Sequence, residues 1–139
     1  MGKGVKGYGI GEAIIVPCLD LKKPVEIWAG YGKSSSIYQS NSRQSKIRIT
    51  IVQAELYGPT QYGTVYKNLK IIEENVVKLK DINNYQNLSI PEYEKETYFS
   101  EQYGSEVEYN YFLGIQIIEV YKGAKWDDTC ISEIRNSGD

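Results

Sequence analysis

The 139-residue sequence contains no histidine. That absence excludes Ser-His and Cys-His nucleophile pairs, and it removes the most frequent zinc ligand. The two cysteines, Cys18 and Cys130, are far apart in the sequence, and we expect two free buried thiols rather than a disulfide. An enzyme built from this chain would need a carboxylate pair or a metal ion instead.

Long runs of one character are also missing. No apolar run approaches the roughly 20 residues that a membrane helix needs, so no membrane span is predicted. Lys3 and Lys6 are followed by no apolar stretch of the signal-peptide type. The 16 basic and 18 acidic residues form no long run of either sign, which argues against nucleic acid or an anionic membrane as a partner.

Tyrosine is the residue type in excess. The chain has 13 tyrosines but only two phenylalanines and two tryptophans. Tyrosine suits half-buried sheet faces and wet binding surfaces, because an apolar ring carries a polar hydroxyl. The length predicts one domain, which is large enough to bury a core without disulfides.

Alternating patterns predict several strands. Residues 25–29 (VEIWA) alternate between Pro24 and Gly30, and residues 14–16 form a short apolar run. Residues 45–56 (SKIRITIVQAEL) place three isoleucines on one face and polar side chains on the other. Residues 109–123 (YNYFLGIQIIEVYKG) are mostly apolar on both faces, which indicates a central strand.

The middle of the chain is more ambiguous. Residues 65–81 (VYKNLKIIEENVVKLKD) have a helix-like Glu and Lys content. The β-branched pairs on either side of Glu73-Glu74-Asn75 nevertheless favour two short strands around a turn, and residues 58–63 (GPTQYG) predict a turn and loop. Several strands without a long amphipathic helix predict a β-sandwich or barrel.

Residues 91–111 (PEYEKETYFSEQYGSEVEYNY) are acidic and rich in tyrosine. We expect a solvated loop or an edge hairpin there. The alternative is a recognition loop, since binding residues concentrate on loops that a rigid scaffold carries.

Two nucleotide-binding motifs fail on their context. Residues 2–7 (GKGVKG) match G-x-G-x-x-G, but no strand precedes them and strand-like residues follow. Gly32-Lys33-Ser34 lacks the upstream glycine of a phosphate loop, because Ile27 stands at that position.

A dense group of reactive side chains lies near the end of the chain. Asp127 and Asp128 could ligate a hard cation or act as a base, but too few oxygen donors cluster there for a calcium loop. We favour a structural role, in which an aspartate and Thr129 bond to backbone amides and shape a tight loop.

Four ordered segments resemble a known domain family. They are residues 7–12 (GYGIGE), 27–49 (IWAGYGKSSSIYQSNSRQSKIRI), 79–90 (LKDINNYQNLSI) and 117–134 (IIEVYKGAKWDDTCISEI). Together they are similar to the discoidin-like (factor V/VIII type C), galactose-binding-fold domain that bacterial NAD glycohydrolases carry as a translocation or glycan-binding domain.

The resemblance implies an all-β fold, an antiparallel jelly-roll β-sandwich, as a single domain over residues 1–139. Family members usually carry one or two strands ahead of the segment that matches residues 7–12, so either those first strands are absent here or another segment supplies them. It implies that residues 127–129 form the loop into a last strand at residues 131–134. It also implies a polar loop before a long strand, with Tyr38, Asn41 and Arg43 on it. These side chains can fix the loop or contact sugar hydroxyls, and we favour the first.

The leading functional hypothesis is a non-catalytic carbohydrate-binding or surface-attachment module of a bacterial protein. The resemblance implies a secreted or cell-surface location and a glycan or cell-surface component as partner. Aromatic rings stack on sugar rings while polar groups hold hydroxyls, so no cofactor is expected and calcium lacks support. The candidate ligand-binding residues are Trp28, Tyr31, Tyr38, Asn41, Arg43, Trp126 and Asp127.

Two alternatives stay open. One is a protein-interaction or toxin-translocation domain without sugar affinity, which would use a sheet face or an exposed edge, or form a strand-swapped homodimer. The other is a carboxylate-dependent hydrolase that acts through Asp127 and Asp128, which we rank below both binding functions.

Overall fold

The computed structural model describes residue 11 and residues 13–32, 34–61, 63–123 and 131–137. Within this part, nearly all regular structure is extended, and one short helix, α1 (Ser35–Ser40), is present. The strands are β1 (Ala13–Val16), β2 (Val25–Ala29), β3 (Arg43–Thr60), β4 (Gly63–Lys78), β5 (Gln86–Leu88), β6 (Thr97–Ser100), β7 (Ser105–Glu108), β8 (Asn110–Tyr121) and β9 (Ile131–Asn136).

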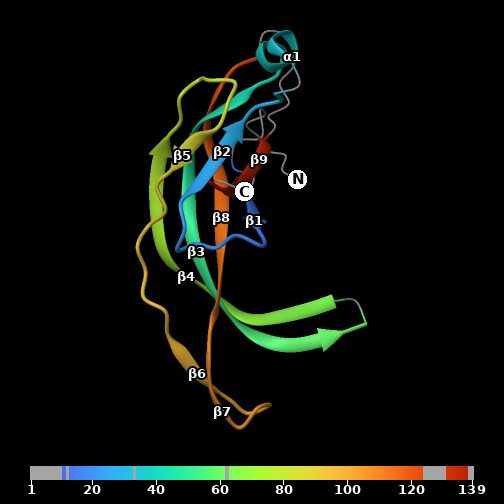
Figure 1. Ribbon diagram of the computed structural model, residues 1–139, viewed down its shortest axis with the longest axis vertical. Coiled ribbons are helices and arrows are strands. Elements are labelled where there is room, and N and C mark those ends of the chain that lie inside the picture. Colours follow the sequence, from blue (N-terminus) through green and yellow to red (C-terminus); the bar gives the residue numbers. More distant parts are fainter. Residues whose placement is uncertain (1–10, 12, 33, 62, 124–130, 138–139) are drawn as a thin grey trace.

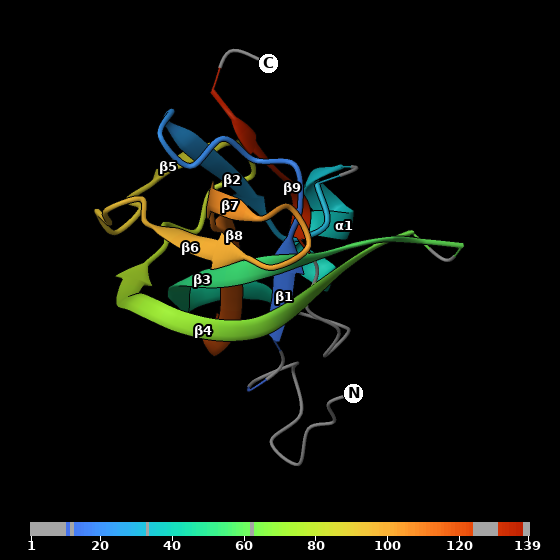
Figure 2. The same ribbon diagram turned by 90° about the horizontal axis from the view of Figure 1, so that it is seen from below.

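The strands form two facing layers and a separate hairpin. One sheet has the order β1-β8-β3-β4, the other has the order β5-β2-β9, and β6 pairs with β7. Neighbouring strands within each sheet are antiparallel. The view from below shows the two larger sheets on opposite sides of the molecule (Figure 2). This arrangement confirms the predicted antiparallel β-sandwich.

The core lies between these two sheets. Ile47, Ile49 and Ile51 of β3 are fully buried, and their partners on β8 are Ile117, Ile115 and Leu113. From the other layer, β2 contributes Val25, Ile27 and Ala29. Each buried isoleucine stabilises the fold by roughly 1.5–3 kcal/mol relative to an exposed one. The alternation along residues 25–29 and 45–56 therefore predicted the core face correctly, and β8 is the central strand expected.

The strand predictions were wrong around β4. Residues 65–81 do not turn at Glu73-Glu74-Asn75, because β4 runs without interruption from Gly63 to Lys78. β4 is the edge strand beside β3, and most of its side chains are exposed. Its charged side chains therefore remain in solvent without disturbing the core. The predicted loop at residues 58–63 is also shorter than expected, since β3 continues to Thr60.

The β3–β4 pair extends beyond the sandwich as a long hairpin (Figure 1). Its register shifts between Ile51 and Val52, between Gln53 and Glu55 and between Leu56 and Gly58. Such irregularities bend and twist a strand. In Figure 1 the hairpin leaves the sandwich at the end opposite α1, beside β6 and β7.

Two further expectations need correction. The residues before β3 form helix α1 rather than a loop. Cys18 is free but exposed, not buried, and its backbone has a positive φ of 65°, while Cys130 lies outside the described residues. The other predicted segments agree with the structure: residues 14–16 belong to β1, residues 131–134 to β9, and residues 91–111 contain the β6–β7 hairpin.

Candidate functional site

Helix α1 owes its position to polar caps and one buried ring. The Ser34 hydroxyl accepts a hydrogen bond from the Ile37 amide at its first turn. At the other end, the Asn41 side-chain amide donates to the Ile37 carbonyl at 3.0 Å. Tyr38 is the buried residue of the helix. Asn41 thus caps the helix and Tyr38 anchors it to the sandwich.

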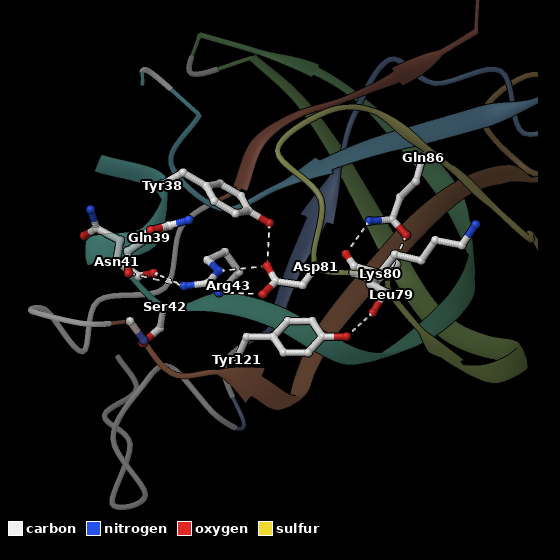
Figure 3. Close-up of polar contacts among 11 residues, drawn as sticks. Tyr38, Gln39, Asn41, Ser42, Arg43, Leu79, Lys80, Asp81, Gln86 and Tyr121 are labelled. Atoms are coloured by element: carbon white, nitrogen blue, oxygen red, sulfur yellow. Dashed lines mark hydrogen bonds and ion pairs between the residues drawn. The ribbon is translucent and has the colours of Figure 1, made fainter. Parts of the chain in front are cut away.

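Arg43, the first residue of β3, lies at the centre of a polar cluster that includes Tyr38 and Asp81 (Figure 3). Its Nε and Nη2 donate to the two carboxylate oxygens of Asp81 at 3.1 and 2.7 Å, which is a bidentate pair. Its Nη1 donates to the carbonyls of Gln39 and Asn41. The Tyr38 hydroxyl donates to Asp81 at 2.7 Å. We call Tyr38, Arg43 and Asp81 the Arg43 cluster.

The cluster shifts the acidity of its own members. The hydrogen bonds from Arg43 hold the pKa of the Asp81 carboxyl below its usual range. Burial and the hydrogen bond to Asp81 raise the pKa of Tyr38 to about 12. Around neutral pH the cluster therefore consists of an ion pair and a neutral phenol. All three guanidinium nitrogens of Arg43 are engaged, so the arrangement orients the chain around it.

Two glycines are required by the close packing around this cluster. Gly30 has a φ of +90°, and a Cβ there would lie 2.5 Å from Cγ of Arg43 and 2.8 Å from Cε1 of Tyr38. A Cβ on Gly123 would lie 2.4 Å from the backbone carbon of Asn41. Any larger residue would displace the helix or the arginine.

Residues 79–85, which follow β4, are held from several sides. Tyr121 donates its hydroxyl hydrogen to the Leu79 carbonyl at 2.8 Å, and the Gln86 side chain bonds both the amide and the carbonyl of Lys80 (Figure 3). Asp81 accepts hydrogen bonds from Arg43 and Tyr38, the other members of the Arg43 cluster. Two residues further on, Asn83 accepts a hydrogen bond from the Trp28 indole at 2.9 Å.

A second group lies on the outer face of the β5-β2-β9 sheet. The Trp28 and Tyr85 rings meet edge to face, with centroids 5.0 Å apart. The Arg135 guanidinium lies 3.7 Å from the Tyr85 ring centroid, and Tyr85 donates its hydroxyl hydrogen to Glu133. We call Trp28, Asn83, Tyr85, Glu133 and Arg135 the outer-sheet patch. It combines aromatic rings with an amide, a carboxylate and a guanidinium on one surface.

A bulge in the pairing of β2 with β9 shapes one border of this patch. The register shifts between Trp28 and Ala29, and Ser132 is the extra residue on β9. The Ser132 hydroxyl donates to the Gly30 carbonyl at 2.7 Å and accepts from the Gly32 amide at 2.9 Å. Gly32 in turn lies so close to the indole that a Cβ there would be 2.6 Å from Nε1 of Trp28.

The structure brings together several of the residues predicted from the sequence. Trp28 contacts residues 79–85 from the outer sheet, while Tyr38 and Arg43 contact them from the α1 side. Tyr31, which precedes Gly32, is 38% exposed. Trp126 and Asp127 lie outside the described residues, as do Asp128 and Thr129.

Sequence reasoning missed half of the arrangement. Asp81, Asn83 and Tyr85 lie in the family-like segment 79–90, but only the folded chain shows that they meet Arg43 and Trp28. Glu133 and Arg135 flank Ile134 in the last strand, where alternation about Ile134 would have placed both outward.

The described residues contain neither a group of metal ligands nor a membrane-spanning helix. In residues 11, 13–32, 34–61, 63–123 and 131–137, no three acidic or cysteine side chains gather as a metal would require. No helix in the same part of the chain is long and apolar enough to cross a membrane.

Comparison with known proteins gives one match. The family model described as NAD glycohydrolase translocation F5/8 type C domain matches residues 2–137, nearly the whole chain. No curated protein matches, and no solved structure matches.

Proposed function

Because the chain belongs to the NAD glycohydrolase translocation F5/8 type C domain family, we propose that it is a non-catalytic module that binds carbohydrate through the outer-sheet patch. The family description names a translocation domain, which fits a non-catalytic binding role. The observation that carries the proposal is the Trp28–Tyr85 ring pair, which lies beside the polar groups of Asn83, Glu133 and Arg135.

The chemistry of the patch suits a sugar. Aromatic rings offer an apolar surface to the C–H face of a pyranose. The Asn83 amide and the Glu133 carboxylate each hold one ring and keep further hydrogen-bonding positions for hydroxyls, while the Arg135 guanidinium pairs with Glu26 at 2.8 Å. The ring pair is held in place before any ligand arrives, since Trp28 is tied to Asn83 and Tyr85 to Glu133. A site that is already ordered loses less conformational entropy on binding.

The Arg43 cluster has a different role in this proposal. Its groups bind each other and the backbone of residues 39 and 41, so they position residues 79–85 for the patch. Of the residues predicted from sequence, Trp28 and Tyr31 are thus assigned to the ligand, whereas Tyr38, Asn41 and Arg43 support them.

A glycan array followed by calorimetric titration tests the proposal. We expect binding to a subset of glycans. Glu133→Gln removes a carboxylate charge and one acceptor oxygen, and Asn83→Ala removes an amide. Each loss is worth about 1.4 kcal/mol, so each variant should weaken that binding about tenfold. Tyr31→Ala, at an exposed ring one position before Gly32, should weaken it less.

Matched controls come from elsewhere on the molecule. Tyr57→Ala and Glu73→Gln change an exposed ring and an exposed carboxylate outside the patch, and both should leave glycan binding unchanged. Absence of binding across the array would refute the proposal. Binding that survives the patch variants but is lost in a control would place the sugar site elsewhere.

A further inference from the structure

The end of the molecule opposite α1 carries a second surface. There the β6–β7 hairpin lies beside the part of the β3–β4 pair that leaves the sandwich (Figures 1 and 2). Between them lies a cleft of about 360 Å³. Its lining includes Glu55, Tyr57, Lys67, Tyr98, Phe99 and Glu101.

The cleft is held open by contacts between the two hairpins. The Leu56 amide donates to the Tyr98 hydroxyl at 3.0 Å, and the Tyr98 ring lies 4.7 Å from the ring of Tyr109. The Gln102 side chain lies close to Gly58. The Leu56–Tyr98 and Gly58–Gln102 contacts join segments that are distant in sequence, so they fix the two hairpins relative to each other.

The walls of the cleft expose aromatic rings to an unusual degree. Phe99 is 60% exposed and Tyr57 is 57% exposed. Tyr103, in the turn of the β6–β7 hairpin, is also exposed. Single exposed apolar side chains are common, but several gathered on one surface indicate an interaction site.

The charge at this end is mostly negative, although Lys67 also lines the cleft. Residues 91–111 contain six glutamates and one lysine, whereas the rest of the chain contains 15 basic and 12 acidic residues. Within the cleft, Glu101 is exposed and has no hydrogen-bond or ion-pair partner among the described residues. A neutral sugar gains little from this field, while a cation is attracted by it.

One cation of the chain already contacts an aromatic ring in the cleft. The ammonium of Lys67 lies 5.7 Å from the Tyr57 ring centroid, within reach of a cation–π contact. A second cation could use the Phe99 ring and the Glu101 carboxylate in the same way.

We propose that this hairpin cleft binds a basic, extended segment of a partner polypeptide, with a Lys or Arg side chain between Phe99 and Glu101. The aromatic rings contact the aliphatic stem of that side chain, and the carboxylates attract its charge. The surface is small, so binding is weak and salt-dependent. It is separate from the outer-sheet patch and does not depend on the proposed sugar binding.

Fluorescence polarisation with a labelled eight-residue peptide of alternating Lys and Thr tests the proposal. The same peptide with Glu or with Gln in place of Lys serves as the charge control. We expect the Lys peptide alone to bind, and to bind at least about tenfold more weakly at 0.5 M than at 0.05 M salt. Phe99→Ala should weaken binding about fivefold and Glu101→Gln about threefold.

One variant should gain affinity, which a folding defect cannot imitate. Lys67→Gln removes the cation that competes within the cleft, and we expect binding to tighten about threefold. Lys70→Gln changes the net charge as Lys67→Gln does, and Glu73→Gln changes it as Glu101→Gln does. Both control positions lie further along β4, so each control should change affinity less than about 1.5-fold. Tyr31→Ala, one position before Gly32, should have no effect.

Three outcomes overturn the proposal. One is equal binding of the Gln or Glu peptide. Another is an effect of Glu73→Gln as large as that of Glu101→Gln, which would indicate attraction to the net charge of the whole chain. The third is unchanged binding in Phe99→Ala, with the folded state verified by circular dichroism.

Discussion

At the α1 end, the Arg43 side chain is 9% exposed and every guanidinium nitrogen donates to a partner within the chain. At the hairpin end, Phe99 and Tyr57 are mostly exposed, and Glu101 has no partner among the described residues. Both ends combine aromatic rings with charges. The difference is where the charges find their partners: the partners of Arg43 are inside the molecule, whereas a partner for Glu101 must come from outside.

This contrast has a consequence for mutations. Groups that satisfy each other inside the fold contribute to stability, so their loss should lower the free energy of unfolding. Groups that remain exposed contribute little to stability and are available for binding. Matched substitutions at the two ends should therefore separate folding effects from binding effects.

The largest contrast is expected between two glycines with positive φ. Gly30→Ala forces a Cβ into Arg43 and Tyr38 at a φ of +90°, and we expect a loss of about 3–5 kcal/mol in the free energy of unfolding. Gly104→Ala, in the β6–β7 turn, meets open space at a φ of +63° and should cost only about 1–2 kcal/mol. Urea denaturation measures both, and equal losses would contradict the close packing around Arg43.

A second contrast removes one carboxylate charge at each end. Asp81→Asn leaves the guanidinium of Arg43 without its anion. Because Asp81 is 37% exposed, we expect about 1.5–3 kcal/mol rather than the full cost of a buried pair. Glu101→Gln should change the free energy of unfolding by less than about 0.5 kcal/mol.

The same pair predicts a dependence on acid pH. The pKa of Asp81 is lower in the folded protein than in the unfolded chain. Its contribution to stability is therefore present above the unfolded pKa of about 3.9 and is lost as pH falls through the folded pKa. Asp81→Asn should flatten the acid side of the stability curve measured by urea denaturation, and an unchanged acid slope would argue against the ion pair.

A further contrast is expected at alkaline pH. The folded state raises the pKa of Tyr38 to about 12, above the unfolded value of about 10. The folded protein then binds the proton more tightly, so stability is retained below pH 10 and falls by about 1.4 kcal/mol per unit as pH rises toward 12. Tyr38→Phe should reduce this slope, whereas Tyr57→Phe, at the exposed end, should not.

Local patterns predicted most of the sandwich. The period-two alternation at residues 25–29 and 45–56 identified the buried face, because successive side chains on a strand point to opposite sides of the sheet. The same reasoning failed at β4. Its polar run Glu73-Glu74-Asn75 was predicted to be a turn, but the strand is mostly exposed and continues through these residues. It also missed α1, a helix of six residues that depends on the Ser34 cap and on the burial of Tyr38.

The candidate site was less predictable than the fold. Trp28, Tyr38 and Arg43 were identified as residue types that suit a ligand, but their partners were not. Asp81 is 38 positions from Arg43, and Asn83 is 55 positions from Trp28. A local sequence pattern does not show which distant residues meet in the fold. The structural role of Arg43 and the binding role proposed for Trp28 therefore could not be told apart from sequence.

The sequence by itself determined the strands at residues 25–29, 45–56 and 109–123, the core face of the first two and the excess of acidic residues at 91–111, because these follow from side-chain periodicity and composition. Only the tertiary structure decided that Arg43 is satisfied by Asp81 while Glu101 is left to solvent. The physical reason is that hydrogen bonds and ion pairs act over a few ångströms, and folding alone sets which distant residues come within that range.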